Sequence, residues 1–388
     1  MGRTVQVPVN PDVLRWARQT SGATFEEVAK RIKVSASTFA KWETQETPLA
    51  LTQLRELADY FKRPLAAFLL PKPPEEHPLP KDYRTLPDGN GTFKRETWLA
   101  IRKARRLQSI ARELMRSLER DTKPQFSSAR LSDDPGAVAQ RERERLGISL
   151  ERQQGWQDQR EALTAWSNAI ERLNILVLQL RIPVEDVRGF SLGDEEPYVI
   201  AVSSSDALRA RIFTLFHEYA HLLLHNAGIC APRLEMHPQR KEAEVEIWCN
   251  GFSGSFLVPP QALPQVSKAT KLKDQTLFDF LEETSGSLKL SEQVVLRRLL
   301  DVGLVSRPTF YRAMGELTAK ALAAKAKQKG GQRRPAKECL DKNGASFSSL
   351  VLEARNRGLV TFADVSDFLD VRLKWLPEIE SALMVRAA

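Results

Sequence analysis

Apolar residues in the first 70 positions recur at the three- to four-residue spacing of short amphipathic helices. Side chains that favour helix N-termini precede these apolar runs, and Thr24 is followed after three residues by Glu27, the pattern of a capping box. This part of the chain therefore predicts a run of four short helices. Their expected starts lie at Asn10, Thr24, Ser35 and Leu51.

The next segment has two different patterns. Residues 71–80 are rich in proline, which cannot continue a helix, so a stiff linker is expected over residues 71–91. Residues 92–119 then predict one long basic helix, because apolar residues from Trp98 to Leu118 lie near one face. We interpret its lysines and arginines as a solvated face.

The hydrophobic period changes near residue 175. Residues 175–180 and 198–203 are short runs rich in β-branched residues, which predict strands. Residues 206–225 and 240–256 return to helical spacing, as does the chain after residue 290. The predicted fold class is mainly α with a small β-sheet (α+β). The strand over residues 198–203 is expected at the sheet edge, where an extended peptide can pair with it.

Charge and composition narrow the function classes. The net charge of +9 and the pI near 9.4 favour a polyanionic partner such as nucleic acid, although acids and bases are interspersed. The three cysteines form no CxxC pair and predict no disulfide framework. No signal-peptide pattern is present, and the most apolar stretch, residues 174–184, is too short to cross a bilayer. A cytoplasmic protein without a membrane partner is expected.

The strongest chemical signal is the sequence His217-Glu218-Tyr219-Ala220-His221. Histidines four residues apart on a helix can reach one ion from the same side. The glutamate after the first histidine then lies near the open coordination position, where it can accept a proton from the nucleophilic water. A chain of this composition is expected to hold roughly 0.01 accidental matches. The motif predicts a metal-dependent hydrolase with Zn²⁺, and the same donors also accept Mn²⁺.

A catalytic zinc site needs a third protein ligand and one open position. The next helix offers Glu242, Glu244 and Glu246. Glu246 is favoured because Asn250 follows one turn later on the same face and can hydrogen-bond a ligating imidazole, while Glu242 shares that face and remains an alternative. His225 lies one turn beyond the second histidine of the motif. It is interpreted as a residue that does not bind the metal itself but helps to position the ligands or the helix.

Residues 25–43 have the spacing of a helix-turn-helix, with the small Ala29 allowing the two helices to pack closely. DNA contacts are expected from the N-terminal part of the second helix, which enters a major groove in such proteins. These positions are Ala36, Ser37, Thr38 and Lys41. Residues 1–70 hold ten Lys/Arg and seven Asp/Glu, a net of only +3, so binding would be weak and sensitive to salt. A protein-docking bundle is the alternative.

Taken together, these motifs resemble the ImmA/IrrE family of metallopeptidases in the architecture that begins with an Xre-like helix-turn-helix. The resemblance covers most of the chain, and its segments include residues 82–86, 213–225, 246–250 and 291–311. It implies a gluzincin-like fold in which His217, His221 and Glu246 hold the metal and Glu218 is the catalytic base. It also implies regulated proteolysis of a repressor protein, in stress responses or in the control of mobile elements.

At 388 residues the chain is too long for one ordinary core. The expected domains are an Xre-like helix-turn-helix domain at 1–70, a Pro-rich linker at 71–91, a metallopeptidase domain at 92–290, a helical extension at 291–330 and a C-terminal helical domain at 331–388. The leading hypothesis is a metallo-endopeptidase that cleaves a transcriptional repressor. The alternatives are a transcriptional regulator whose metal domain senses without cleaving, and the effector of a toxin–antitoxin or phage-defence pair.

Overall fold

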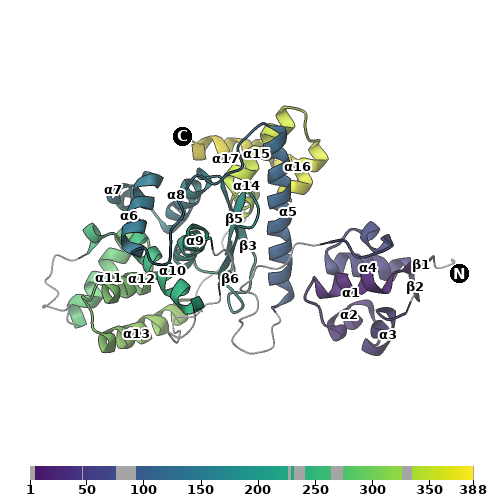
Figure 1. Ribbon diagram of the computed structural model, residues 1–388, viewed down its shortest axis with the longest axis horizontal. Helices are drawn as coiled ribbons and strands as arrows, with labels where there is room; N and C mark the ends of the chain where they lie inside the picture. The colour runs from purple at the N-terminus through teal and green to yellow at the C-terminus, as the bar shows by residue number, and fades with distance from the viewer. Residues whose placement is uncertain are drawn as a thin grey trace. The chain divides into compact units, whose positions relative to one another are not determined.

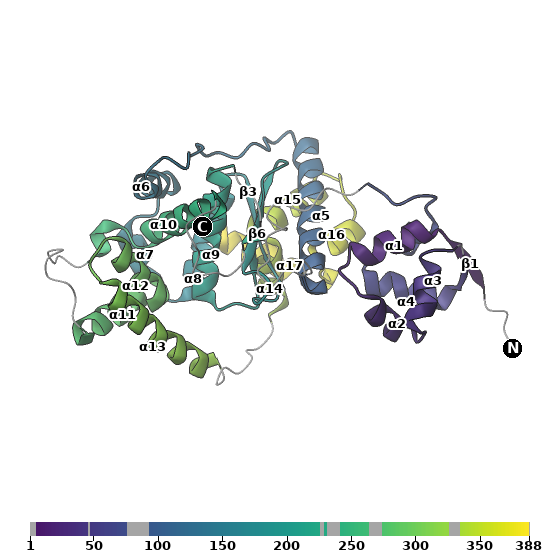
Figure 2. The same cartoon turned by 60° about the horizontal axis from the view of Figure 1, so that its bottom comes forward.

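The computed structural model describes residues 5–45, 47–75, 93–225, 229–230, 241–263, 274–325 and 334–387 (Figures 1 and 2). Within these residues the chain is mainly helical with two small sheets, which confirms the predicted fold class. The chain divides into two compact units, residues 1–103 and 104–388, and helix α5 (Arg95–Ser117) begins in the first and ends in the second. The finer domain boundaries expected from the sequence stay predictions, and much of the expected linker lies outside the described residues.

The first unit is a helical bundle that also holds a two-stranded antiparallel sheet. Strand β1 (Gln6–Val9) pairs with β2 (Thr47–Ala50), a sheet that the helical spacing did not predict. The helices are α1 (Pro11–Gln19), α2 (Phe25–Ile32), α3 (Ala36–Trp42), α4 (Leu51–Phe61) and the 3-10 helix η1 (Leu65–Leu69). Their apolar faces form one core around Leu14, Phe39 and Phe61, each at most 1% exposed.

The helix starts in this unit follow from local hydrogen bonds. The side chain of Asn10 accepts from the backbone at the start of α1. Thr24 Oγ1 accepts from the Glu27 backbone N–H at 3.2 Å, and the Glu27 carboxylate accepts from the Thr24 N–H at 2.9 Å. Ser35 Oγ accepts from the Thr38 N–H at 3.0 Å. These three predicted N-caps are confirmed.

The turn between α2 and α3 is formed by a non-glycine residue in a left-handed conformation. Lys33 has φ 57° and ψ 47°, and its N–H donates to the Ala29 carbonyl. Left-handed backbone costs an L-residue about 1–2 kcal/mol, which is why glycine is usual at such a position. Despite this cost, α2 and α3 are joined by the tight turn that a helix-turn-helix requires.

The second unit contains a four-stranded sheet in the order β3-β5-β4-β6. Its strands are β3 (Ile175–Leu180), β4 (Gly189–Leu192), β5 (Tyr198–Ser203) and β6 (Ile229–Cys230). β3 and β5 match the two predicted strands and pair in parallel, while β4 pairs antiparallel with both β5 and β6. The prediction that residues 198–203 form the sheet edge is wrong, because the short strand β4 occupies the other side of β5.

Helices cover this sheet on both faces. α9 packs against β4 and β5, and α8 and α14 pack against β3. In both views the sheet lies between α9 and the part of α5 from Ala104 onward (Figures 1 and 2). Besides the end of α5, the helices of this unit are α6 (Pro135–Leu146), α7 (Leu150–Gly155), α8 (Gln159–Glu171), α9 (Leu208–Leu223), α10 (Lys241–Leu257), α11 (Asp274–Leu288), α12 (Glu292–Asp301), α13 (Arg307–Lys325), α14 (Pro335–Asn343), α15 (Ala345–Asn356), α16 (Phe362–Leu369) and α17 (Leu376–Ala387).

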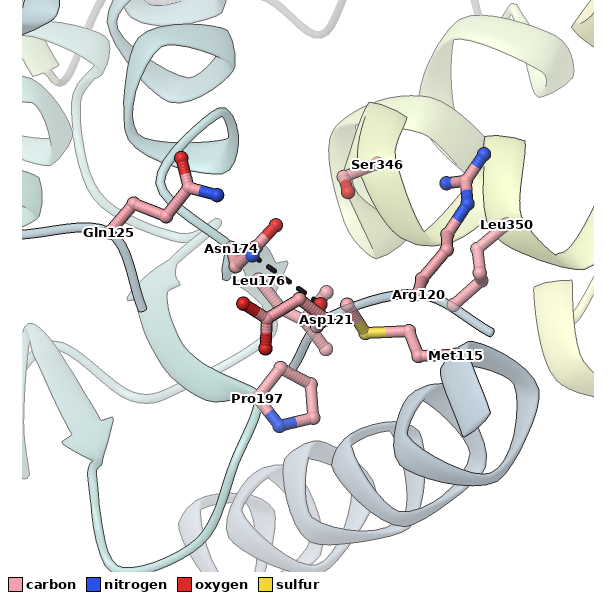
Figure 3. A pocket seen from close by; sticks show the side chains of 9 residues that line it. All are labelled: Met115, Arg120, Asp121, Gln125, Asn174, Leu176, Pro197, Ser346 and Leu350. Carbon is pink, nitrogen blue, oxygen red and sulfur yellow. Dashed lines mark hydrogen bonds between the residues drawn. The ribbon is translucent and has the colours of Figure 1, made fainter. Parts of the chain in front are cut away.

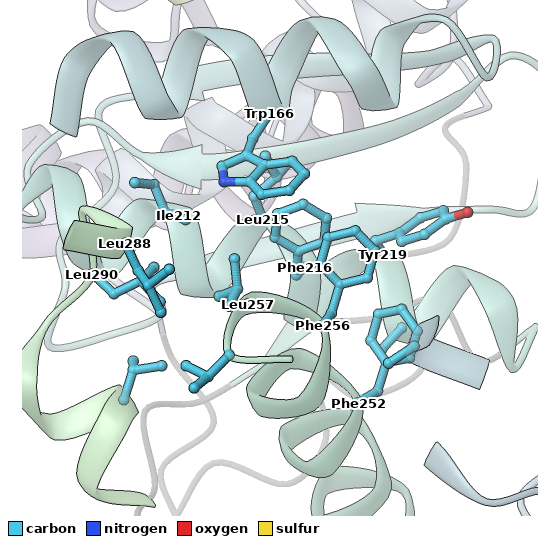
Figure 4. Packing of buried hydrophobic residues seen from close by; sticks show 14 of the residues in the cluster. Trp166, Ile212, Leu215, Phe216, Tyr219, Phe252, Phe256, Leu257, Leu288 and Leu290 are labelled. Carbon is cyan, nitrogen blue, oxygen red and sulfur yellow. The ribbon is translucent and has the colours of Figure 1, made fainter. Parts of the chain in front are cut away.

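An aromatic cluster joins the helices that carry the candidate site (Figure 4). Trp166 of α8 meets Phe216 of α9 edge-to-face, with ring centroids 4.9 Å apart, and meets Phe256 of α10 at 5.4 Å. Phe216 and Phe256 stack at 4.2 Å. All three rings are fully buried, and each such side chain stabilises the fold by about 1.5–3 kcal/mol through burial. The cluster therefore fixes α9 and α10 side by side.

The basic helix α5 is partly paired rather than simply solvated. Arg105 Nη1 lies 2.5 Å from the Asp194 carboxylate, and the Arg105 side chain is only 14% exposed. Gln108 Nε2 and Arg112 Nε donate to backbone carbonyls of residues 195–197 at 2.7–3.0 Å. The helix thus holds the loop between β4 and β5 in place. No helix in the described part of the chain is both long and apolar enough to cross a membrane.

Candidate metal centre

Helix α9 carries the two histidines of the motif through the interior of the second unit. Every residue from Thr214 to Leu223 is buried, in agreement with a helix that is apolar nearly all round. His217 is 7% exposed and His221 is 1% exposed. Imidazoles buried to this degree need polar partners, because an unpaired polar group in the interior is unfavourable.

Helix α10 supplies that partner. Glu246 Oε2 lies 3.1 Å from His217 Nε2, and Glu246 Oε1 lies 3.2 Å from His221 Nε2. The two Nε2 atoms are 3.2 Å apart, and the possible ligand atoms of the three residues lie within 4.8 Å of one another. Two imidazole nitrogens and one carboxylate converging on one point are a donor set that suits a single Zn²⁺. The arrangement therefore fits the metal that the motif predicts.

The carboxyl group of Glu246 is kept in its charged form. Burial alone raises its pKa, but hydrogen bonds from the imidazoles of His217 and His221 outweigh burial and hold the pKa well below its usual range. A carboxylate that stays charged in a largely buried position is the form that binds a cation.

Glu218 lies beside these groups and is fully buried at 0% exposure. Burial raises its pKa, the two histidines oppose that rise, and the Glu246 charge adds to it. Neither of its carboxylate oxygens makes a hydrogen bond of normal geometry with another described residue. A buried carboxylate next to a candidate metal site is suited to accept and release a proton.

Strand β4 approaches α9 closely at this point because of a glycine. A Cβ added to Gly189 would lie 2.5 Å from Thr214 Cγ2, 2.9 Å from the Ala201 carbonyl and 3.4 Å from Glu218 Cγ. Any side chain here would push the strand away from the helix. The sequence interpretation missed β4, because a four-residue strand leaves little periodic signal.

The structure does not bring the two expected supporting residues to the imidazoles. Asn250 is half-buried one turn after Glu246, but within the described part of the chain it makes no hydrogen bond to either imidazole. Cys249, fully buried, contacts His221 instead: burial raises the pKa of the thiol, and the hydrogen bond with His221 opposes the rise. His225 lies beyond the end of α9, is exposed, and its Nε2 pairs with the Ser128 hydroxyl.

One other carboxylate of α10, that of Glu244, is placed differently from Glu246. Glu244 is exposed, and the side chain of Glu242, the alternative ligand, lies outside the described residues. Only Glu246, among the carboxylates of α10 with described side chains, reaches the two histidines.

A buried carboxylate on the other side of α9 was not expected from the sequence. The Tyr219 hydroxyl donates to Glu142 Oε2 at 2.8 Å, and Glu142 also pairs with Arg141 at 3.0 Å and Arg145 at 3.1 Å. Glu142 is 0% exposed. In the sequence it belongs to an alternating run of arginine and glutamate, which resembles a solvated face, so no sequence signal marks its burial.

The expected DNA-contacting residues lie on α3. Ser37, Thr38 and Lys41 are exposed, whereas Ala36 is half-buried and packs against the core of the first unit. The hydroxyls of Ser37 and Thr38 lie 2.9 Å and 2.6 Å from Ser35 Oγ. The exposed part of the predicted face is therefore smaller than expected and carries one positive charge.

A cavity of about 250 Å³, lined by polar and apolar residues alike, lies elsewhere in the second unit, at the end of α5 and the start of β3 (Figure 3). Within it, Asn174 Nδ2 donates to the Asp121 carbonyl at 3.4 Å. None of the site residues predicted from the sequence lines this cavity, so it is separate from the metal centre. Its lining is formed by Met115, Arg120, Asp121, Gln125, Asn174, Leu176, Pro197, Ser346 and Leu350.

Comparison with known families agrees with both units. Residues 170–300 match the Peptidase_M78 family, described as the IrrE N-terminal-like domain, and residues 12–68 match a helix-turn-helix domain. No curated protein and no solved structure gives a match. The peptidase-family match spans α9 and α10, which carry the histidines and Glu246. The chain thus combines a metallopeptidase-type domain of the ImmA/IrrE family with an N-terminal helix-turn-helix domain.

Proposed function

We propose that this chain is a zinc-dependent endopeptidase that cleaves a transcriptional repressor. The observation that carries the proposal is the convergence of His217, His221 and Glu246 within 4.8 Å, beside the buried carboxylate of Glu218. The peptidase-family match supports a hydrolase of this type. The accompanying helix-turn-helix domain supports a role in gene regulation, from which the repressor substrate is inferred.

In this proposal the three converging residues hold the ion and Glu218 moves the proton. When held there, Zn²⁺ would supply Lewis-acid chemistry, which makes water a stronger acid and the scissile carbonyl more electrophilic. Glu218 accepts the proton of the nucleophile and then delivers it to the leaving amine. The aromatic cluster around Trp166 keeps α9 and α10 in register, so that the base and the ligands keep their mutual positions.

The fourth residue distinguishes catalysis from metal sensing. A sensing site needs the two histidines and Glu246, but it has no need of a further carboxylate beside them. Glu218 is fully buried and makes no hydrogen bond of normal geometry with another described residue, an unfavourable arrangement that a catalytic task would explain. This favours the peptidase over the non-cleaving regulator.

The test compares the wild-type chain with the Glu218→Gln variant, using candidate repressor proteins from the same genome as substrates. We expect one zinc per chain in both proteins, and cleavage of the repressor by the wild type alone. Glu244→Gln, an exposed glutamate on α10, is the matched control and should cleave normally. Cleavage by Glu218→Gln would show that Glu218 is not the base. Stoichiometric zinc without cleavage by the wild type, combined with zinc-dependent DNA binding, would favour the sensor.

The helix-turn-helix domain is proposed to bind DNA through Ser37, Thr38 and Lys41 of α3. Lys41→Ala should weaken operator binding and reduce the slope of log affinity against log salt by about 1, the effect of losing one phosphate contact. Arg55→Ala, an exposed cation on α4, is the control and should leave the slope unchanged. Equal affinity of wild type and Lys41→Ala at every salt concentration would favour protein docking instead.

A further inference from the structure

Strand β4 places a serine against the helix that carries the proposed base. Gly189 and Ser191 are two residues apart on this strand and therefore share one face. At Gly189 that face lies 3.4 Å from Glu218 Cγ, measured from an ideal Cβ position. Ser191 is also fully buried on this face of β4, with its hydroxyl beside the Glu218 carboxylate.

The two groups face each other without a direct hydrogen bond of normal geometry. Ser191 Oγ and both carboxylate oxygens of Glu218 are buried, and none of them makes a hydrogen bond of normal geometry with another described residue. Two fully buried serines of the same unit do make hydrogen bonds: Ser253 donates to the Cys249 carbonyl at 2.8 Å, and Ser203 donates to the Ile182 carbonyl at 2.6 Å. Packing alone does not explain Ser191, because alanine would fill nearly the same space without a buried hydroxyl to satisfy.

The strand that carries Ser191 is held in register from outside the site. Ser191 is paired with Ile200 of β5, and the loop that joins the two strands is bound by Gln108 and Arg112 of α5. A shift by one residue would turn the serine to the other face of the sheet. The fold therefore keeps Ser191 on the face of β4 that lies against Glu218 at Gly189.

We propose that Ser191 is a positioning residue whose hydroxyl holds the Glu218 carboxylate, directly or through one water, in the orientation needed for proton transfer. The proposal rests on the proposed function, since it requires Glu218 to be the base. A serine suits this role because it offers one O–H donor on a short side chain. The rest of the oxygen lone pairs of Glu218 then stay available to the nucleophile.

The test measures the binding of acetohydroxamate to the full-length chain loaded with Co²⁺ in place of zinc. Hydroxamic acids chelate the metal and pass their proton to a correctly oriented base beside it, and the visible absorption of Co²⁺ reports binding without any substrate. Ser191→Ala should retain one Co²⁺ per chain and bind the probe about tenfold more weakly, the effect of losing one hydrogen bond to a charged group. Ser253→Ala, an equally buried serine on α10, should bind it like the wild type.

The outcomes separate this proposal from the proposed function. Wild-type affinity in Ser191→Ala would overturn the role of Ser191, provided that Glu218→Gln binds the probe weakly. Wild-type affinity in Glu218→Gln would overturn the role of Glu218 and the present proposal with it. If Ser191→Ala does not fold, Ser191→Cys decides: it keeps the shape but donates weakly, so reduced affinity at full Co²⁺ content supports the proposal and wild-type affinity overturns it.

Discussion

Two buried carboxylates on opposite sides of α9 have different partners. Glu246 is paired with the imidazoles of His217 and His221, whose neutral forms are metal ligands. Glu142 is paired with arginines and with the Tyr219 hydroxyl. Arginine keeps its proton at any ordinary pH, so the second arrangement can only be structural. The chemistry of its partners thus distinguishes a buried carboxylate of the candidate metal centre from one that only stabilises the fold.

The stabilising role of Glu142 can be tested by changing Tyr219, which donates a hydrogen bond to it. Tyr219→Phe removes the hydrogen bond to Glu142 while the aromatic ring stays, and the free energy of unfolding should fall by about 1–3 kcal/mol because the lost bond went to a buried charged group. Urea unfolding of the second unit measures this, and the zinc content should stay at one per chain. Tyr311→Phe, at a residue that is 59% exposed, is the control. Equal unfolding midpoints for both variants would contradict the assignment.

At the scale of elements, the helix-turn-helix depends on one strained residue. The turn after α2 requires a left-handed backbone, and the chain places Lys33 there at φ 57°. The family-model match and the observed turn agree that the motif forms in spite of this residue. The surrounding core and the capping box of α2 compensate for the local cost.

This strain predicts opposite effects for two glycine substitutions three residues apart. Lys33→Gly should raise the free energy of unfolding of the first unit by about 1 kcal/mol, because glycine adopts positive φ without a steric penalty. Lys30→Gly, at an exposed position inside α2, should lower it by about 1 kcal/mol, because glycine is a poor helix former. Thermal unfolding of the two variants measures both changes. A shift of the same sign in both would refute the strain argument.

At the scale of the molecule, the two compact units carry different motifs. The helix-turn-helix match lies in the first unit, and all residues of the candidate metal centre lie in the second. Helix α5 contributes residues to both. The metal centre is therefore expected to form independently of the core of the first unit.

Phe61→Ala tests this independence in the full-length chain. Phe61 is fully buried in the core of the first unit, and its loss should cost that unit about 3–5 kcal/mol. DNA binding should be lost, while the zinc content, measured by elemental analysis, should remain at one per chain. Loss of zinc in this variant would mean that the second unit depends on the first.

The sequence by itself determined the features that arise from neighbouring residues. A helix N-cap depends on residues within three positions of one another, so Thr24 and Ser35 predict the starts of α2 and α3 from the sequence alone. Residues 175–180 and 198–203 are apolar enough to be recognised as strands from their own composition. Histidines four residues apart share a helix face wherever the helix lies, so the motif was visible before any fold was known. Its role as a metal site stays a prediction.

Only the tertiary structure decided which distant segments meet. It placed β4 beside β5, and so moved β5 from the expected edge to the interior and brought Ser191 to Glu218. It buried Glu142 from a segment whose alternating charges resemble a solvated face, and it left His225 outside the site. These outcomes depend on contacts between residues tens of positions apart. Local periodicity carries no information about such pairings, because they are chosen by the packing of the whole core.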